Sequence, residues 1–101
     1  MNEMFKAERK CVEGWLNKLI KQSKALSDIR ECPLDEDMCA CGLSWHREIQ
    51  IYKGIEKIAL YLQKVITFNP NWSADYPEKG ESYFYYKGCK IYQLWTKKEV
   101  I

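Results

Sequence analysis

The chain has 101 residues, of which 47% are hydrophobic and 14% aromatic. This composition is typical of a globular protein, because disordered chains are poor in aromatic residues and rich in net charge. The length suits one hydrophobic core, so we expect a single domain over residues 1–101. The formal net charge is only +2, which does not by itself indicate a nucleic-acid partner.

The sequence also indicates a cellular location. No stretch approaches the roughly 18 consecutive apolar residues that a membrane span needs. The first ten residues carry charges where a secretory signal needs an apolar run. Five cysteines without such a signal predict free thiols or metal ligands rather than disulfides. We therefore expect a cytoplasmic protein with no membrane partner.

An amphipathic helix is predicted over about residues 3–28. Its apolar residues recur at helical spacing: Phe5, Val12, Trp15, Leu16, Leu19 and Leu26. Its opposite face is rich in lysine and includes Lys18 and Lys21. Such a strip is either an ordinary solvated helix surface or a surface that orients an anionic partner.

The connector over residues 29–43 contains the strongest local motif. Cys32, Cys39, Cys41 and His46 supply four zinc-type donors within fifteen residues. A bound Zn²⁺ would order a segment that has few apolar residues of its own. The spacing matches no strong zinc template, however, so the alternative is that the cysteines are small buried hydrophobic residues. The acidic run from Asp35 to Asp37 is expected to be a solvated turn.

A second helix is predicted over about residues 44–67, with Ser44 as its N-cap. Its apolar stripe is broad and runs from Trp45 to Ile66 before Asn69 and Pro70 end the helix. Residues 68–81 have two prolines and no regular period, which indicates a long, packed aromatic loop. The predicted fold class is therefore α+β, with two amphipathic helices packed on a C-terminal antiparallel β-hairpin in the order ααββ.

The predicted hairpin covers residues 82–96, with a two-residue turn at Lys87 and Gly88. This turn would place Phe84, Tyr86, Cys89, Ile91 and Trp95 on the side that faces the helices. The other side would carry Tyr83, Tyr85, Lys90, Tyr92 and Leu94, which we call the tyrosine face. Exposed tyrosines are common anchors of protein interfaces. The alternatives are that a further strand, the loop or a second subunit in a homodimer covers this face.

No recognised catalytic motif is present, so we expect a protein that is not an enzyme. The first hypothesis is a small interaction protein that binds a larger partner, most readily a protein, through Tyr83, Tyr85, Lys90 and Tyr92, with Lys18 and Lys21 orienting it. It would regulate or inhibit that partner. The Lys-, Ile-, Tyr- and Asn-leaning composition suggests a phage or mobile-element inhibitor of bacterial host machinery, such as an anti-defence protein.

Two further functional hypotheses remain open from the sequence. One is a zinc-stabilised nucleic-acid-binding module that uses the basic helix and the tyrosines to bind phosphates and stack bases. The other is a thiol-dependent enzyme or redox sensor that uses Cys41 and His46. That chemistry needs a third, orienting group, which the sequence does not identify.

Overall fold

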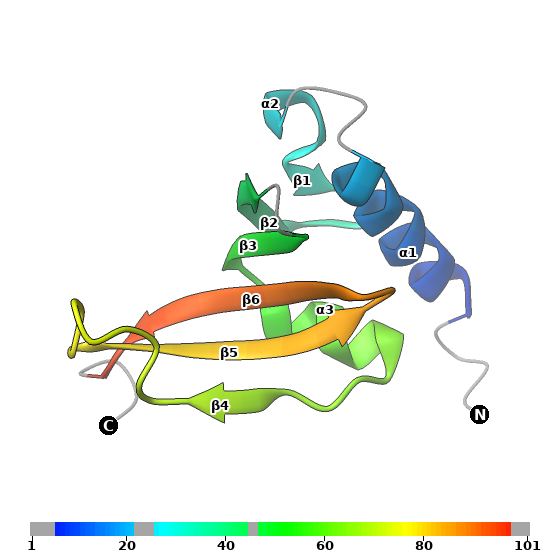
Figure 1. Ribbon diagram of the computed structural model, residues 1–101. Coiled ribbons are helices and arrows are strands. Elements are labelled where there is room, and N and C mark those ends of the chain that lie inside the picture. The colour runs from blue at the N-terminus through cyan, green and yellow to red at the C-terminus, as the bar shows by residue number, and fades with distance from the viewer. Residues whose placement is uncertain (1–5, 22–25, 45–46, 98–101) are drawn as a thin grey trace.

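The computed structural model describes residues 6–21, 26–44 and 47–97. Along the described chain two helices are followed by three strands, a third helix and three more strands (Figure 1). The helices are α1 (Lys6–Lys21), α2 (Leu26–Ile29) and α3 (Ile55–Leu62). The strands are β1 (Glu31–Cys32), β2 (Asp35–Ser44), β3 (Glu48–Lys53), β4 (Thr67–Asn69), β5 (Lys79–Tyr86) and β6 (Cys89–Thr96).

The strands form one six-stranded mixed sheet in the order β1-β2-β3-β6-β5-β4. The central pair, β3 and β6, is parallel, and the other neighbours are antiparallel. Both α1 and α3 pack on one face of this sheet (Figure 1). Among the described residues, no helix covers the other face, and no helix is long and apolar enough to cross a bilayer.

The predicted arrangement of two helices on a C-terminal hairpin is therefore wrong. Strand β3 takes the place of the first part of the helix expected at 44–67, and within the described part of that range only Ile55–Leu62 is helical. Ile49 and Ile51 are buried, whereas the residues between and after them are not, which is the period of a strand. The spacing of three from Ile49 to Tyr52 and Ile55 imitates a helix, but Gly54 at φ 91° separates strand from helix.

The prediction of an irregular connector over residues 29–43 is also wrong, because most of this segment forms β1 and β2. Pro33 lies in the tight turn between these strands, where its missing N–H group costs no ladder hydrogen bond. The expected aromatic loop is shorter than predicted, since β4 and β5 take both of its ends. Within the remaining loop, Trp72 stacks on Tyr76 with ring centroids 5.6 Å apart.

The predicted C-terminal hairpin is confirmed. Tyr86 pairs with Cys89 and Phe84 with Ile91, as expected for a two-residue turn. Lys87 and Gly88 both have positive φ, 51° and 77°, which suits the right-handed twist of the strands. The first helix, predicted over about residues 3–28, is confirmed from Lys6 to Lys21. Residues 3–5 and 22–25 lie outside the described residues, and residues 26–28 belong to α2.

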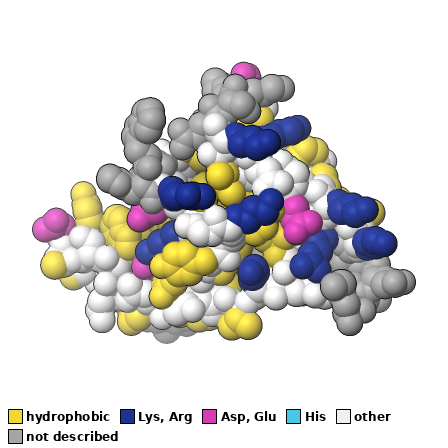
Figure 2. Space-filling view, turned by 45° about the vertical axis from the view of Figure 1, so that its right-hand side comes forward, with side chains coloured by type: hydrophobic (Ala, Val, Ile, Leu, Met, Phe, Trp, Pro, Cys, Tyr) yellow, Lys and Arg dark blue, Asp and Glu magenta, His cyan; other side chains and the backbone are white. Residues whose placement is uncertain are grey.

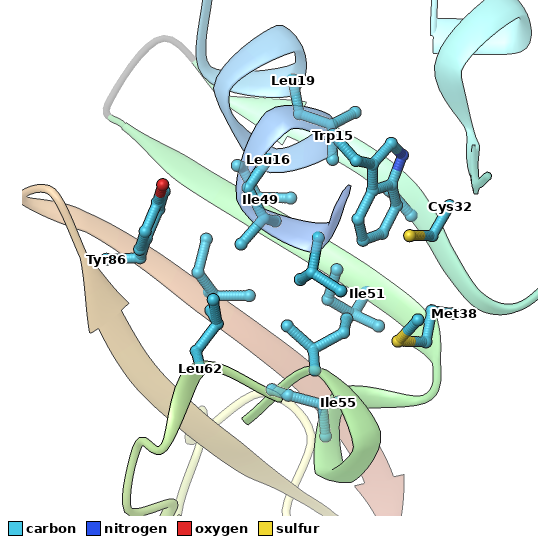
Figure 3. Packing of buried hydrophobic residues seen from close by; sticks show 14 of the residues in the cluster. Trp15, Leu16, Leu19, Cys32, Met38, Ile49, Ile51, Ile55, Leu62 and Tyr86 are labelled. Atoms are coloured by element: carbon cyan, nitrogen blue, oxygen red, sulfur yellow. The ribbon is translucent and has the colours of Figure 1, made fainter. Parts of the chain in front are cut away.

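The core lies between the helices and the sheet (Figure 3). Leu16 from α1, Ile51 from β3 and Ile91 from β6 are almost completely buried there. Trp15 also lies in the core, and its indole Nε1 donates a 2.7 Å hydrogen bond to the Ile29 carbonyl at the end of α2. This bond joins two segments that are fourteen residues apart in the sequence.

We expect Trp15→Phe to lower the free energy of unfolding by about 2 kcal/mol, because the buried Ile29 carbonyl loses its donor and the ring becomes smaller. Urea unfolding measures this change. Trp72→Phe is the matched control, since Trp72 is only partly buried in the loop. Equal losses in the two variants would contradict the assigned role of the Trp15 hydrogen bond.

Candidate functional site

The tyrosine face lies on the side of the sheet away from α1 and α3. Tyr83 is directly opposite Tyr92, and Tyr85 is opposite Lys90. The ring of Tyr85 is 58% exposed and stands edge-on to Tyr83, with centroids 5.9 Å apart and planes at 83°. The structure thus brings together the four hairpin residues that the sequence analysis proposed for partner binding.

A buried ion pair lies at the centre of this face. Lys90 Nζ is 3.0 Å from each carboxylate oxygen of Glu81, whose side chain is only 4% exposed. Asn69 of β4 donates a 3.1 Å hydrogen bond to Oε1. Oε2 accepts no hydrogen bond among the described residues, so the Lys90 charge is what compensates it.

Lys90 also orders the aromatic rings. Its ammonium lies 4.8 Å from the ring centroid of Tyr83 and 5.5 Å from that of Tyr92. These are cation–π distances, so one side chain links two rings to Glu81. Burial raises the pKa of Tyr92, and the nearby carboxylates of Glu48 and Glu81 raise it further. Like any tyrosine at neutral pH, Tyr92 is protonated, so its hydroxyl can donate a hydrogen bond to a ligand.

The open side of the sheet extends beyond the hairpin to β3. Gln50 is opposite Tyr92, and Tyr52 is 62% exposed. A shallow depression of about 380 Å³ opens here, and its lining includes Gln50, Tyr52 and Leu94. The sequence analysis missed this part because it placed Tyr52 in a helix. The strict alternation of residues 48–52 was the signal for a strand.

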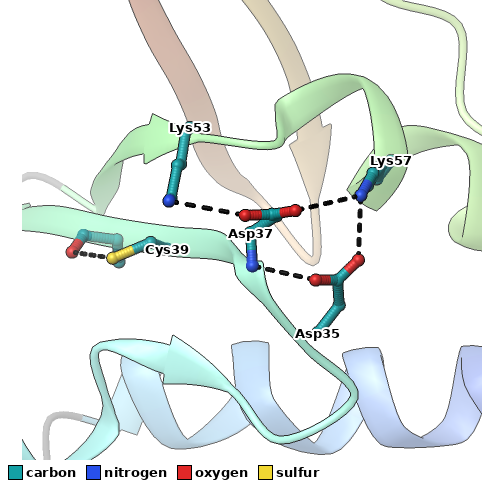
Figure 4. Close-up of polar contacts among 6 residues, drawn as sticks. Asp35, Asp37, Cys39, Lys53 and Lys57 are labelled. Carbon is teal, nitrogen blue, oxygen red and sulfur yellow. Dashed lines mark hydrogen bonds and ion pairs between the residues drawn. The ribbon is translucent and has the colours of Figure 1, made fainter.

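The candidate zinc ligands are only partly described. Cys32 and Cys39 are buried, and Cys41 is exposed at an irregularity of β2. Cys39 Sγ lies 3.7 Å from the Ala40 carbonyl (Figure 4). His46 lies outside the described residues. Within the described ranges, no three His, Cys, Asp or Glu side chains are grouped closely enough to hold a metal ion. The four-ligand zinc site therefore stays a prediction.

The environment of the thiols does not favour a nucleophile. Burial raises the pKa of the Cys41 thiol, and nearby Cys39 raises it further. Burial likewise raises the pKa of Cys32, with a smaller rise from Cys11. Because a nucleophilic cysteine needs a lowered pKa and an electropositive setting, these two thiols are poorly activated.

Lysines pair with two acids of the acidic run, Asp35 and Asp37 (Figure 4). Lys57 Nζ lies 2.9 Å from Asp35 and 3.6 Å from Asp37, and Lys53 Nζ lies 3.5 Å from Asp37. The Asp37 backbone N–H, and then Lys57, lower the pKa of Asp35. The carboxylates thus have cationic partners, and the expected solvated turn is instead the beginning of β2.

Lys18 and Lys21, the two basic residues proposed to orient a partner, are exposed on α1. They lie on a different part of the surface from the tyrosine face. No protein family, curated protein or solved structure matches this chain.

Proposed function

We propose that this protein is a small, non-enzymatic interaction protein that binds a larger protein through its tyrosine face and thereby regulates or inhibits it. The observation that carries this proposal is a sheet surface that no described helix covers, on which Lys90 contacts the rings of Tyr83 and Tyr92 and Tyr85 contacts Tyr83. Tyrosines supply a large contact area with only two flexible torsions each.

The tyrosine rings are already held by contacts within the free protein, which supports the proposal. Each flexible side chain that becomes immobilised on binding reduces the binding free energy by about 0.5–1.5 kcal/mol. Rings that are already fixed avoid part of this loss. Tyr83 and Tyr92 are fixed by the Lys90 ammonium, and Tyr85 by its edge contact with Tyr83. The adjoining depression beside Tyr52 offers a recess for a side chain of the partner.

The charges of this face favour a protein over a polyanion. Lys90 is the one cation of the tyrosine face, and Glu81 already neutralises it. Glu48 lies opposite Lys90 on β3 and adds a negative charge. A phosphate backbone would meet no uncompensated positive charge on this face. A protein surface with apolar and hydrogen-bonding groups would match it better.

We expect this function in the cytoplasm. The narrower conjecture, a phage or mobile-element inhibitor of host machinery, has only the amino-acid composition in its support. Regulation through zinc or through a reactive thiol is not part of the proposal, because neither has a described set of residues to perform it.

The test replaces Tyr83, Tyr85 and Tyr92 together with alanine. We expect affinity for the partner to fall by at least about 100-fold, because buried aromatic anchors contribute about 2 kcal/mol or more each. The partner is first identified with a photo-cross-linking residue at position 85. A cross-linking residue at position 65 is the control, since Val65 is 88% exposed outside the sheet.

The matched control variant carries Leu60→Ala and Val65→Ala, which remove exposed apolar side chains away from the tyrosine face. It should keep the partner. If the triple variant unfolds, the tyrosines are structural and the proposal fails; if it keeps the cross-linked partner, the binding surface lies elsewhere. Sedimentation of the purified protein shows whether the cross-linked partner is a second copy of the chain.

A further inference from the structure

Four cationic residues lie on three segments that hydrogen bonds join at one corner of the molecule, which we call the basic corner. They are Lys18 and Lys21 of α1, Arg47 before β3, and Lys87 in the β5–β6 turn. All four residues are exposed. Figure 2 shows Lys and Arg side chains spread over the side that carries α1, where they outnumber the acidic ones.

Hydrogen bonds to neutral oxygens hold this corner together. Asn17 of α1 accepts a 3.1 Å hydrogen bond from Lys87 Nζ and a 3.2 Å bond from the Tyr86 hydroxyl. Arg47 donates a 3.4 Å bond to the Lys87 carbonyl, and its own carbonyl accepts a 2.9 Å bond from Lys90 N. The helix, the hairpin turn and the start of β3 are thus tied to one another.

The charges of the basic corner are uncompensated within the described part of the chain. The ion pairs there use other cations: Arg9, Lys53, Lys57 and Lys90. None of Lys18, Lys21, Arg47 and Lys87 lies within ion-pair distance of a described carboxylate. Four like charges at one corner attract anions and repel one another.

The position of Tyr85 indicates which anion fits. Tyr85 is paired with Lys90, the residue whose N–H bonds to Arg47, and it is two residues from Lys87. Its exposed ring therefore lies near the turn that carries Lys87, but on the opposite side of the sheet from α1, so a ligand would reach it by passing around the turn. Cations that follow a backbone beside a ring that stacks a base are the combination found in proteins that bind single-stranded nucleic acid. Three of the four cations are lysines, which bind phosphate as point charges on flexible stems and do not require one fixed geometry.

We propose that the basic corner binds the phosphate backbone of single-stranded nucleic acid and that Tyr85 stacks on a base at its border. The proposal does not rest on the protein-binding function, because its cations lie outside the tyrosine face. Tyr85 alone belongs to both surfaces.

The test measures fluorescence anisotropy of fluorescein-labelled dT20 and rU20 with the full chain, between 50 and 200 mM NaCl. The test variant carries Lys18→Glu, Lys21→Glu and Lys87→Glu. We expect its affinity at 50 mM salt to fall at least about 50-fold, and the slope of log K against log salt to become shallower by about 2, since each lost phosphate contact contributes about 0.7.

The control variant carries Lys6→Glu, Lys64→Glu and Lys97→Glu, which change the net charge equally at other exposed positions. It should keep most of the affinity. Tyr85→Ala should weaken binding about ten-fold while leaving the salt slope unchanged, because a stacking contact releases no counterions. Circular dichroism of each variant verifies the fold.

Three results would overturn the proposal. The first is no binding of either oligonucleotide by the native chain at 50 mM salt. The second is an equal loss in the test and control variants, which would mean that net charge alone attracts the probe. The third is labelled poly-L-glutamate binding at the basic corner more tightly than dT20, which would identify an acidic protein as its partner.

Discussion

Lys90→Met is expected to lower the free energy of unfolding by about 3 kcal/mol at pH 7, because it leaves the Glu81 carboxylate buried without its cation. Methionine keeps most of the length of the lysine stem, so the loss reports chiefly on charge. Glu81 would retain only the Asn69 hydrogen bond on Oε1. Urea unfolding at constant ionic strength measures the change.

The double variant Glu81→Gln/Lys90→Met provides the control, because it removes both charges. It should recover most of the lost stability, since a neutral amide costs far less to bury than a lone carboxylate. Lys57→Met, which removes the surface ion pairs with Asp35 and Asp37, should cost less than about 1 kcal/mol of folding stability. A Lys90→Met variant as stable as Lys57→Met would show that water reaches Glu81 and that the pair does not order the tyrosine face.

Gly54→Ala is expected to destabilise the fold by about 3 kcal/mol or more, by clash and by backbone strain. Gly54 has φ 91° between β3 and α3. A Cβ atom there would lie 2.4 Å from the Asp37 carbonyl oxygen and 2.9 Å from the Met38 Cα. Both are backbone atoms of β2, so no side-chain rotation relieves the contact. Thermal and urea unfolding measure the loss.

Gly14→Ala is the matched control for this substitution. Gly14 is exposed within α1, and a Cβ atom there would meet nothing within 4 Å. Alanine should stabilise the helix by up to about 1 kcal/mol, because it has the higher helix propensity. If both glycine variants shift stability in the same direction, β2 does not pack against Gly54 as described.

The Lys90–Glu81 pair also bears on function. Replacing a buried ion pair with well-packed apolar residues is often neutral or stabilising, so such a pair is weak evidence for stability alone. Here it lies beneath solvent-facing tyrosines and contacts two of their rings. We interpret it as a device that orients Tyr83 and Tyr92 for a partner.

Local sequence determined the hairpin and the tyrosine face. The Lys87–Gly88 turn sets the register, and in a strand the register decides which side each residue occupies. Tyr83, Tyr85 and Tyr92 could therefore be assigned to one side without knowledge of the rest of the fold. The helical spacing of Val12, Leu16 and Leu19 likewise predicts α1, because that spacing has no competing strand pattern.

Only the tertiary structure decided that most of residues 29–53 form strands and which cations make up the basic corner. Ile51, Ile55 and Ile58 fit a helix period, whereas Ile49 and Ile51 fit a strand period, and pairing of β3 with β2 and β6 selects the strand for residues 48–53. Arg47 and Lys87 are 40 residues apart, yet their hydrogen bond brings them together. Such proximity follows from long-range sheet pairing, which local spacing does not encode. The sequence alone therefore identified Lys18 and Lys21, but not Arg47 and Lys87, as members of the corner.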